Sequence, residues 1–295
     1  MPLLSLPARF LHFYSRNGFR GQWRLTSLLS QRIKSLHHVP IEVSNRIVFV
    51  DLRLGGSLDL LKGSPWDRAP FEICEQEIMR KLVRPTDTVF DIGANIGLHT
   101  LLLADLADQG KVFAFEPNPE LLPCLRLTIS RVQNAELIPY ALSDKSGTQT
   151  LFIPDDDHMM SSFSDWSVGS FSRSAHTVNC ETITLDDLLS SGRITKPDFI
   201  KCDVEGAEVR VFRGATEALN NRDAPIVLFE INSQAARTAN NSVDEAVEFL
   251  RTLDGPKFTF YKVEGRELVP FRGCDGSCNV VAIPANRLTE AISRF

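Results

Sequence analysis

Two acids and a glycine turn have the spacing that is typical of a binding site for a nucleotide-like ligand. Asp91 ends an apolar run, and the turn GANIG at residues 93–97 follows it directly. Glu116 ends the next apolar run, roughly 20 residues past the turn, where a carboxylate can accept both hydroxyl protons of a ribose diol. A carboxylate at Asp91 would repel a pyrophosphate, so we expect a ligand with positive charge and hydrogen-bond donors. The alternative is that both acids are ordinary surface residues at strand ends.

A third acid, Asp144, follows the apolar run at residues 136–142 and is placed to reach the amino group of a bound purine. A Ser-Asp turn is also common capping chemistry, so a purely local role for Asp144 stays open. All three acids would lie at the carboxyl ends of parallel strands, which share one edge of a sheet.

A single doubly wound α/β sheet would position these residues. Apolar runs alternate with helical patterns, which is typical of parallel strands joined by helices. Seven runs predict a seven-stranded sheet: residues 88–92, 112–115, 136–142, 198–203, 226–231, 258–263 and 279–283. The short connection at residues 264–266 predicts that the last strand returns antiparallel. We also expect a further strand at residues 148–153 and a small strand pair around Gly55-Gly56.

Six blocks of this sequence resemble, in order and spacing, the FkbM-type methyltransferase family. They are FDIGANIG (90–97), AFEPNP (114–119), ALSD (141–144), TLDDL (184–188), IKCDVEGAE (200–208) and FEIN (229–232). The resemblance covers residues 72–235 well. It implies a Rossmann-like, class I methyltransferase fold, S-adenosylmethionine as cofactor, and methylation of hydroxyl oxygens on sugars, glycans or natural products. We therefore predict a methyltransferase domain at residues 41–295, preceded by an extension at residues 1–40.

The same resemblance implies roles for the first group of acids. Asp91 and the backbone of the turn would face the cationic methionine end of the cofactor, Glu116 would hold the ribose diol, and Asp144 would lie at the adenine edge. The turn residues in question are Gly93, Asn95 and Gly97.

Methyl transfer to a neutral hydroxyl calls for a nearby base or metal. Asp203, Glu205 and Glu230 stand at the ends of adjacent strands and can act as a base with its partners, or can bind Mg²⁺ or Ca²⁺. We favour Asp203 and Glu205 as the pair nearest the acceptor, although Glu205 can instead cap the following helix. His99 and His158 are alternative bases.

The polar stretch at residues 154–178 interrupts the alternation of strands and helices. It carries Phe163, Trp166 and Phe171, which suit packing against a sugar ring. We predict either a loop that folds over the acceptor or a disordered segment.

Composition limits the classes of partner. The formal net charge is −5, although residues 1–41 hold six Lys/Arg and no acid, so the remainder is more acidic still. Such a domain is a poor candidate for binding nucleic acid. Six scattered cysteines predict reduced, structural thiols. No run reaches the length of a transmembrane helix, and the start lacks the apolar core of a signal peptide, so we expect a cytoplasmic protein.

The extension at residues 1–40 mixes bulky apolar and basic side chains. This mixture suits peripheral contact with an anionic membrane, a partner protein, an Arg-rich targeting segment or a solvated helical lead-in.

Two other functions compete with methyl transfer. A nicotinamide dehydrogenase would use an acid in the role of Glu116, but its G-x-G-x-x-G turn requires a third glycine, which this turn lacks. A non-catalytic scaffold that binds cofactor or glycan would not need the acids at all four of the positions Asp91, Glu116, Asp203 and Glu205.

Overall fold

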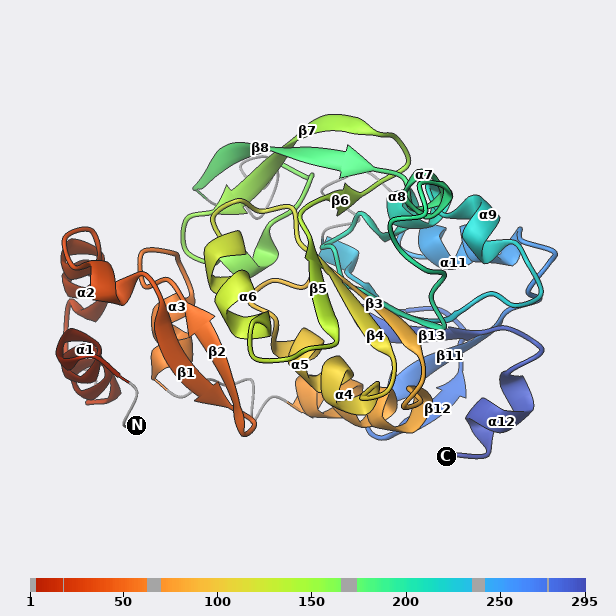
Figure 1. Ribbon diagram of the computed structural model, residues 1–295, viewed down its shortest axis with the longest axis horizontal. Helices are drawn as coiled ribbons and strands as arrows, with labels where there is room; N and C mark the ends of the chain where they lie inside the picture. Colours follow the sequence, from red (N-terminus) through yellow and green to blue (C-terminus); the bar gives the residue numbers. More distant parts are fainter. Residues whose placement is uncertain (1–3, 18, 63–69, 166–173, 235–241, 275) are drawn as a thin grey trace.

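The computed structural model describes residues 4–17, 19–62, 70–165, 174–234, 242–274 and 276–295 (Figure 1). Its centre is an eight-stranded sheet in the order β12-β11-β13-β10-β9-β3-β4-β5. The strands are β3 (Thr88–Ile92), β4 (Lys111–Phe115), β5 (Ala135–Ile138), β9 (Phe199–Cys202), β10 (Ile226–Ile231), β11 (Thr259–Glu264), β12 (Glu267–Pro270) and β13 (Cys278–Ile283). Strands β5, β4, β3, β9 and β10 are parallel, and β13 is antiparallel to its neighbours β10 and β11. The predicted α/β sheet with an antiparallel last strand is confirmed.

The sheet holds one strand more than predicted. The turn at residues 264–266 leads into β12, which pairs with β11 as an edge hairpin, and not into the final strand. The antiparallel direction of the last strand was thus predicted correctly, although residues 264–266, on which the prediction was based, do not lead into that strand. The four residues of β12 are partly exposed and end in Pro270, so they lack the apolar run by which the other strands were found.

Helices cover both faces of the main sheet, as a doubly wound fold requires (Figure 1). Successive side chains of β3 point to opposite faces, so Val89 and Phe90 belong to different hydrophobic clusters. The Val89 face is covered by α4 (Pro70–Leu82), α5 (Leu98–Leu106), α6 (Leu122–Ile129) and α12 (Leu288–Ile292). The Phe90 face is covered by α7 (Leu185–Ser190), α8 (Glu208–Arg213), α9 (Thr216–Leu219) and α11 (Glu245–Arg251).

A second sheet of three strands borders the carboxyl ends of the main strands. It consists of β6 (Ala141–Leu142), β7 (Gly147–Pro154) and β8 (Ala175–Ile183) in the order β6-β8-β7, with the short helix η3 (His158–Met160) after β7. β7 confirms the strand predicted at residues 148–153. The strand predicted at residues 136–142 is divided between the two sheets, because Pro139 has no N–H to donate and interrupts the ladder.

Residues 4–61 form a lobe at one end of the molecule (Figure 1). Its elements are α1 (Leu6–Arg16), α2 (Gln22–Ser30), η1 (Lys34–Leu36), β1 (Val39–Val43), β2 (Arg46–Val50) and α3 (Ser57–Leu61). Its core continues onto α5 through Leu98 and Leu101. β1 and β2 turn at Ser44 and Asn45, which have φ values of 49° and 62°, so the strand pair predicted around Gly55-Gly56 is wrong. Among the described residues, no helix has both the length and the hydropathy needed to cross a membrane.

Candidate active site

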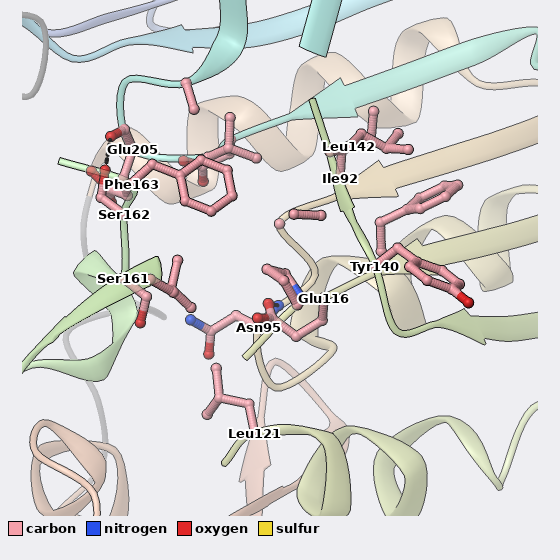
Figure 2. Close-up of a pocket in the computed structure, with 18 of the residues that line it drawn as sticks. Ile92, Asn95, Glu116, Leu121, Tyr140, Leu142, Ser161, Ser162, Phe163 and Glu205 are labelled. Carbon is pink, nitrogen blue, oxygen red and sulfur yellow. Dashed lines mark hydrogen bonds between the residues drawn. The ribbon is translucent and has the colours of Figure 1, made fainter. Parts of the chain in front are cut away.

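One pocket lies at the carboxyl ends of β3, β4 and β9, next to the small sheet (Figure 2). Gly93, Asn95 and Glu116 line it on the side of β3 and β4, and Asp203 and Glu205 line it on the side of β9. Much of the remaining lining is apolar: Ile92, Phe115, Leu121, Tyr140, Ala141, Leu142, Leu151, Met159 and Phe163. The structure thus brings five of the predicted site residues to a single cavity.

Glu116 is fixed before any ligand binds. Its two carboxylate oxygens accept hydrogen bonds from the backbone N–H groups of Asn95 and Asn118, each at 2.8 Å. Burial raises the pKa of Glu116 to about 7, although the two amides oppose the shift. Each carboxylate oxygen has a further lone pair, so Glu116 can still accept hydrogen bonds from a diol.

The two glycines of the turn have different surroundings. Gly93 has a φ of +84°, and a Cβ added there would lie 1.9 Å from the carbonyl oxygen of Asp203. Gly97 has a φ of +89°, and its Cβ would lie 2.8 Å from Cδ1 of Leu125 on α6. Gly93 therefore allows the turn to rest on the end of β9, whereas Gly97 allows α5 and α6 to pack closely and is not among the residues that line the pocket.

Two predicted cofactor ligands also lie outside the pocket lining. Asp91 is fully buried, and its Oδ2 accepts a hydrogen bond of 2.6 Å from Oγ1 of Thr100. Its other oxygen, Oδ1, is buried with no hydrogen-bond partner among the described residues. Asp144 follows β6 and accepts a hydrogen bond of 3.2 Å from the hydroxyl of Ser143, the local contact that its sequence also suggested. The cofactor roles of Asp91 and Asp144 stay predictions.

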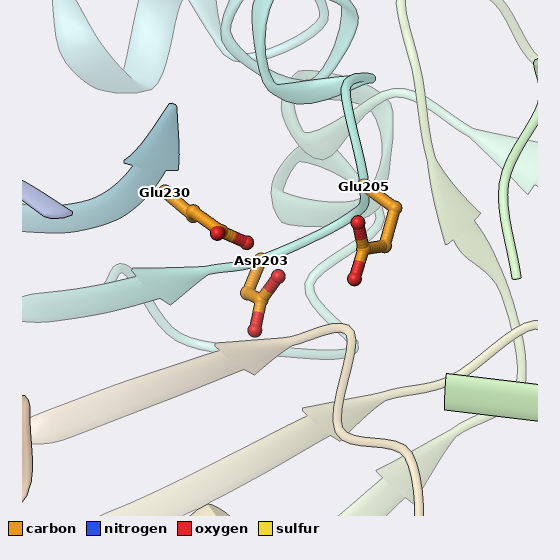
Figure 3. A group of neighbouring side chains, drawn as sticks. All are labelled: Asp203, Glu205 and Glu230. Atoms are coloured by element: carbon orange, nitrogen blue, oxygen red, sulfur yellow. The ribbon is translucent and has the colours of Figure 1, made fainter. Parts of the chain in front are cut away.

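Asp203, Glu205 and Glu230 form a compact group of carboxylates (Figure 3). One oxygen from each lies within 4.8 Å of the others. Asp203 follows β9 directly, Glu205 lies in the loop that leads to α8, and Glu230 comes from β10, the parallel neighbour of β9. The three acids that the sequence places at adjacent strand ends therefore come together.

Lys201 completes this group and was missed by the sequence analysis. The residue is 2% exposed, and its Nζ donates a hydrogen bond of 3.0 Å to Oδ2 of Asp203. A buried ammonium beside a buried carboxylate stabilises the charge of both groups. The only signal in the sequence is a lysine inside an apolar strand, where a charged side chain must have a partner.

The three carboxylates differ in proton affinity. Burial alone would raise the pKa of Asp203, but the ammonium of Lys201 and a hydrogen bond from Glu230 bring it below its usual range. Burial, together with the charge of Asp203, raises the pKa of Glu205 to about 8 and that of Glu230 to about 10. Near neutral pH the group therefore holds one ionised carboxylate, Asp203, and two that retain their protons.

Glu205 is held in place by neighbours from two segments. Nδ2 of Asn232, just after β10, donates to its Oε2 at 2.7 Å, and Oγ of Ser162 donates to its backbone carbonyl at 2.7 Å. Its φ of +52° belongs to the left-handed region, which turns the chain sharply before α8. Glu205 is not the residue that binds the amides of this loop; Oε1 of Glu208 accepts from the N–H groups of Val204 and Gly206.

The stretch at residues 154–178 contributes to the pocket. Met159, Ser161, Ser162 and Phe163 line it, whereas Trp166 and Phe171 lie outside the described residues. The two histidines predicted as alternative bases do not line the pocket.

His158 is 1% exposed, and its Nδ1 contacts the carbonyl of Gly55. His99 lies in α5, with Nε2 3.9 Å from a carboxylate oxygen of Glu75. Neither position supports a direct contact with a ligand in the pocket.

The sequence matches the methyltransferase FkbM domain over residues 91–255, more than half of the chain. The chain belongs to the FkbM methyltransferase family. The family predicted from the six blocks of sequence is confirmed.

Two named methyltransferases are similar to part of this chain. The hexuronic acid methyltransferase AglP of Haloferax volcanii is 33% identical over 157 residues, which cover 52% of this chain and 61% of AglP. The 2-O-methyltransferase NoeI of Sinorhizobium fredii is 26% identical over 157 residues, 49% of this chain and 63% of NoeI. This chain thus spans about three fifths of each relative.

A solved structure, the methyltransferase FkbM of Methylobacillus flagellatus, resembles this one over 76% of this chain and 52% of its own. The sequences are 15% identical and the TM-score is 0.46.

Proposed function

We propose that this FkbM-family protein is an S-adenosylmethionine-dependent O-methyltransferase. One observation carries the proposal: the pocket that contains Glu116, suited to a ribose diol, also contains Glu205, suited to remove a proton from an acceptor. The residues present fit the cofactor, since Oδ1 of Asn95 is a buried acceptor without a hydrogen-bond partner among the described residues. An ammonium or hydroxyl group in the pocket would satisfy it.

Glu205 is the proposed general base. Its raised pKa of about 8 lies near the working range, where a base is both available and strong enough. Asp203 is already ionised and paired with Lys201, so it raises the proton affinity of Glu205 and acts as a positioning residue. Protonated Glu230 donates a hydrogen bond to Asp203 and supports that arrangement.

Bound S-adenosylmethionine would supply a methyl group already activated by positive sulfur. The cofactor would leave as the neutral thioether, and Glu205 would take up the hydroxyl proton that the acceptor loses when its oxygen receives the methyl group. The contribution of this chain is alignment of the acceptor opposite the methyl carbon and uptake of that proton.

The proposed acceptor is a hydroxyl on a sugar, a glycan or a natural product. The names of AglP and NoeI support a sugar and an oxygen atom, respectively. Phe163 in the pocket lining supports the same class, because an aromatic ring offers an apolar face to a sugar ring.

The Mg²⁺ considered as an alternative from sequence stays a prediction. Asp203, Glu205 and Glu230 are oxygen ligands of the kind that Mg²⁺ prefers. Lys201, however, already supplies a positive charge to Asp203, and two of the three carboxylates retain protons near neutrality. Cytoplasmic location, the lack of nucleic-acid binding and the division at residue 40 likewise stay predictions.

Calorimetric titration with S-adenosylmethionine, with NAD⁺ in parallel, tests the cofactor. We expect binding of the methyl donor alone, weakened by Glu116→Ala by about 1–3 kcal/mol because a charged hydrogen-bond acceptor is lost. Transfer of methyl from the donor to sugar acceptors, with and without EDTA, then tests the reaction and its metal requirement. Heat with NAD⁺ only would favour a dehydrogenase, and donor binding without transfer to any acceptor would favour a scaffold.

A further inference from the structure

Exposed large hydrophobic side chains are concentrated on one part of the molecule. Seven such residues are exposed among those described, and six lie within residues 6–28. The six are Leu6, Phe10, Phe13, Phe19, Trp23 and Leu28, and the seventh is Leu127 on α6. Four aromatic rings in so short a segment are more than the scattered apolar residues of an ordinary surface.

Helix α1 carries two apolar stripes, only one of which is used by the fold. Ala8 and Leu11 face inward and belong to the core of the N-terminal lobe. Leu6, Phe10 and Phe13 recur at the i, i+4, i+7 spacing of the other face, and each is at least half exposed, from 50% to 79%. Since the inner stripe already anchors the helix, the outer stripe is available for a partner.

The outer aromatic side chains are stacked on one another. The ring centroid of Tyr14 lies 5.9 Å from that of Phe10 and 4.9 Å from that of Phe19, with the planes nearly parallel in both pairs. Tyr14 and Phe19 thus connect α1 with the turn that precedes α2. The exposed surface is therefore partly ordered in advance, which lowers the entropy lost when it binds.

Basic residues alternate with these apolar residues along the segment. An acid from outside the segment, Asp59, pairs with Lys62, the lysine whose Nζ lies over the ring of Trp23. The six basic residues of this segment are all exposed: Arg9, Arg16, Arg20, Arg24, Arg32 and Lys34. Residues 1–41 contain no Asp or Glu, whereas residues 42–295 hold 26 Lys/Arg against 37 Asp/Glu. The two parts of the chain thus carry charge of opposite sign.

We propose that the outer face of α1 and α2 binds the surface of a bilayer that contains anionic phospholipid. We call this face, formed by the six exposed apolar and six basic residues named above, the basic aromatic face. Aromatic rings suit the headgroup boundary, and Lys/Arg are attracted to anionic headgroups. The acidic remainder of the chain is repelled from the same surface, which fixes the orientation. In Figure 1, α1 and α2 lie at the far end of the molecule from α9 and α12, so lipid can reach them without displacing the main sheet.

Point variants in the full chain test the proposal better than truncation, because Leu4, Ala8 and Leu11 are part of the core and their loss would damage the lobe. The apolar variant is Phe10→Ser with Phe13→Ser, and the charge variant is Arg16→Glu with Arg20→Glu. Leu127→Ser and Arg126→Glu on α6 are matched controls, since both residues are exposed and lie far along the chain from this face. Circular dichroism and thermal melting verify that each variant is folded.

The measurement is co-sedimentation with phosphatidylcholine vesicles, with and without phosphatidylglycerol. We expect binding only when phosphatidylglycerol is present, weakened by salt, with a partition coefficient at least tenfold lower in either double variant and unchanged in both controls. Equal binding by the variants, or no binding to either vesicle, would overturn the proposal. A wild-type dimer in gel filtration that becomes monomeric in the apolar variant, without vesicle binding, would show instead that the face joins two copies of this chain.

Discussion

At the scale of single residues, the surroundings of the site give chemically identical side chains different pKa values. Glu205 and Glu230 carry the same carboxyl group near the same Asp203, yet burial and that charge raise their pKa values to about 8 and about 10. Glu205 can exchange its proton near neutrality, whereas Glu230 keeps its own. The difference follows from their other neighbours, because a hydrogen bond from Asn232 lowers the pKa of Glu205, whereas the charges of Glu205, Glu208 and Glu75 raise that of Glu230 further.

Glu205→Gln should therefore abolish most of the proposed activity. Loss of a general base typically lowers the rate by about 10²–10⁴-fold. In the wild-type protein kcat/KM should rise with pH through an apparent pKa near 8, because only deprotonated Glu205 can accept the proton, and this rise should vanish in the variant. Steady-state rates across the pH range provide the measurement.

Glu230→Gln is the control for that experiment. Protonated Glu230 donates a hydrogen bond to Asp203, and a glutamine amide can donate in its place, so most of the activity should remain. If Glu230→Gln removed the pH dependence while Glu205→Gln preserved it, Glu230 would be the base.

Residue types and spacing were sufficient to predict the three acids that meet at the edge of the sheet, of which Asp203 and Glu205 line the pocket and Glu230 does not, but not their partners. Asp203, Glu205 and Glu230 stand at strand ends that any doubly wound sheet brings to one edge. Lys201 and Asn232 have no pattern of their own, since each matters only through the side chain that it contacts. Asp144 follows a strand in the same way but lies outside the pocket lining, so its contact with the cofactor stays a prediction.

At the scale of elements, the packing of helices against one another and against the sheet fixes the position of the turn at residues 93–97. Gly97 allows α5 to lie against α6, and both helices pack beside β4 and β5 near Glu116. The predicted role of this glycine in binding the cofactor would then be indirect, exercised through the position of the turn.

Gly97→Ala should accordingly lower stability more than cofactor affinity. Its φ of +89° is strained for alanine, and the new Cβ would lie 2.8 Å from Leu125, so we expect a loss of about 1–3 kcal/mol in the free energy of unfolding. Gly192→Ala is a matched control, since its φ is +71° but its Cβ would meet nothing within 4 Å. Urea denaturation compares the two, and titration of the folded variant should show a smaller loss of donor affinity than Glu116→Ala. The reverse order would assign Gly97 to the cofactor.

Element-level prediction succeeded where strands are buried and alternate with helices. Four of the five parallel strands, β3, β4, β9 and β10, consist mainly of buried residues, which gives the continuous apolar runs used to find them. It failed for β12, which is short and partly exposed, and for β1, whose boundary depends on a turn at Ser44 and Asn45. Such features depend on local turn chemistry and edge pairing, not on hydrophobic pattern.

At the scale of the whole molecule, the acids of the site reduce stability as the solution becomes more basic. Glu205 and Glu230 have an ordinary pKa of 4.5 and raised values of about 8 and about 10 in the folded protein. Between the ordinary and raised values the folded protein binds more protons than the unfolded chain, so the free energy of unfolding falls with rising pH.

The melting temperature of the wild-type protein should therefore fall from neutral pH to about pH 8, and less steeply in Glu230→Gln. Each such group contributes at most about 1.4 kcal/mol per pH unit in this interval. Differential scanning calorimetry at several pH values measures both slopes. A slope unaffected by the substitution would mean that Glu230 is ionised in the folded protein.

The contact between Gly93 and the carbonyl of Asp203 limits which parts of the pocket can vary in evolution. The backbone of the turn at Gly93 lies against the backbone carbonyl of Asp203 with no side chain between them, so the backbone span between the proposed cofactor turn and the proposed base, Glu205, does not depend on rotamers. Much of the remaining pocket wall comes from the small sheet and the segment after β7. Substitutions in that wall can alter which molecule is admitted while the span stays fixed, so the selection of an acceptor and the execution of the chemistry can evolve independently.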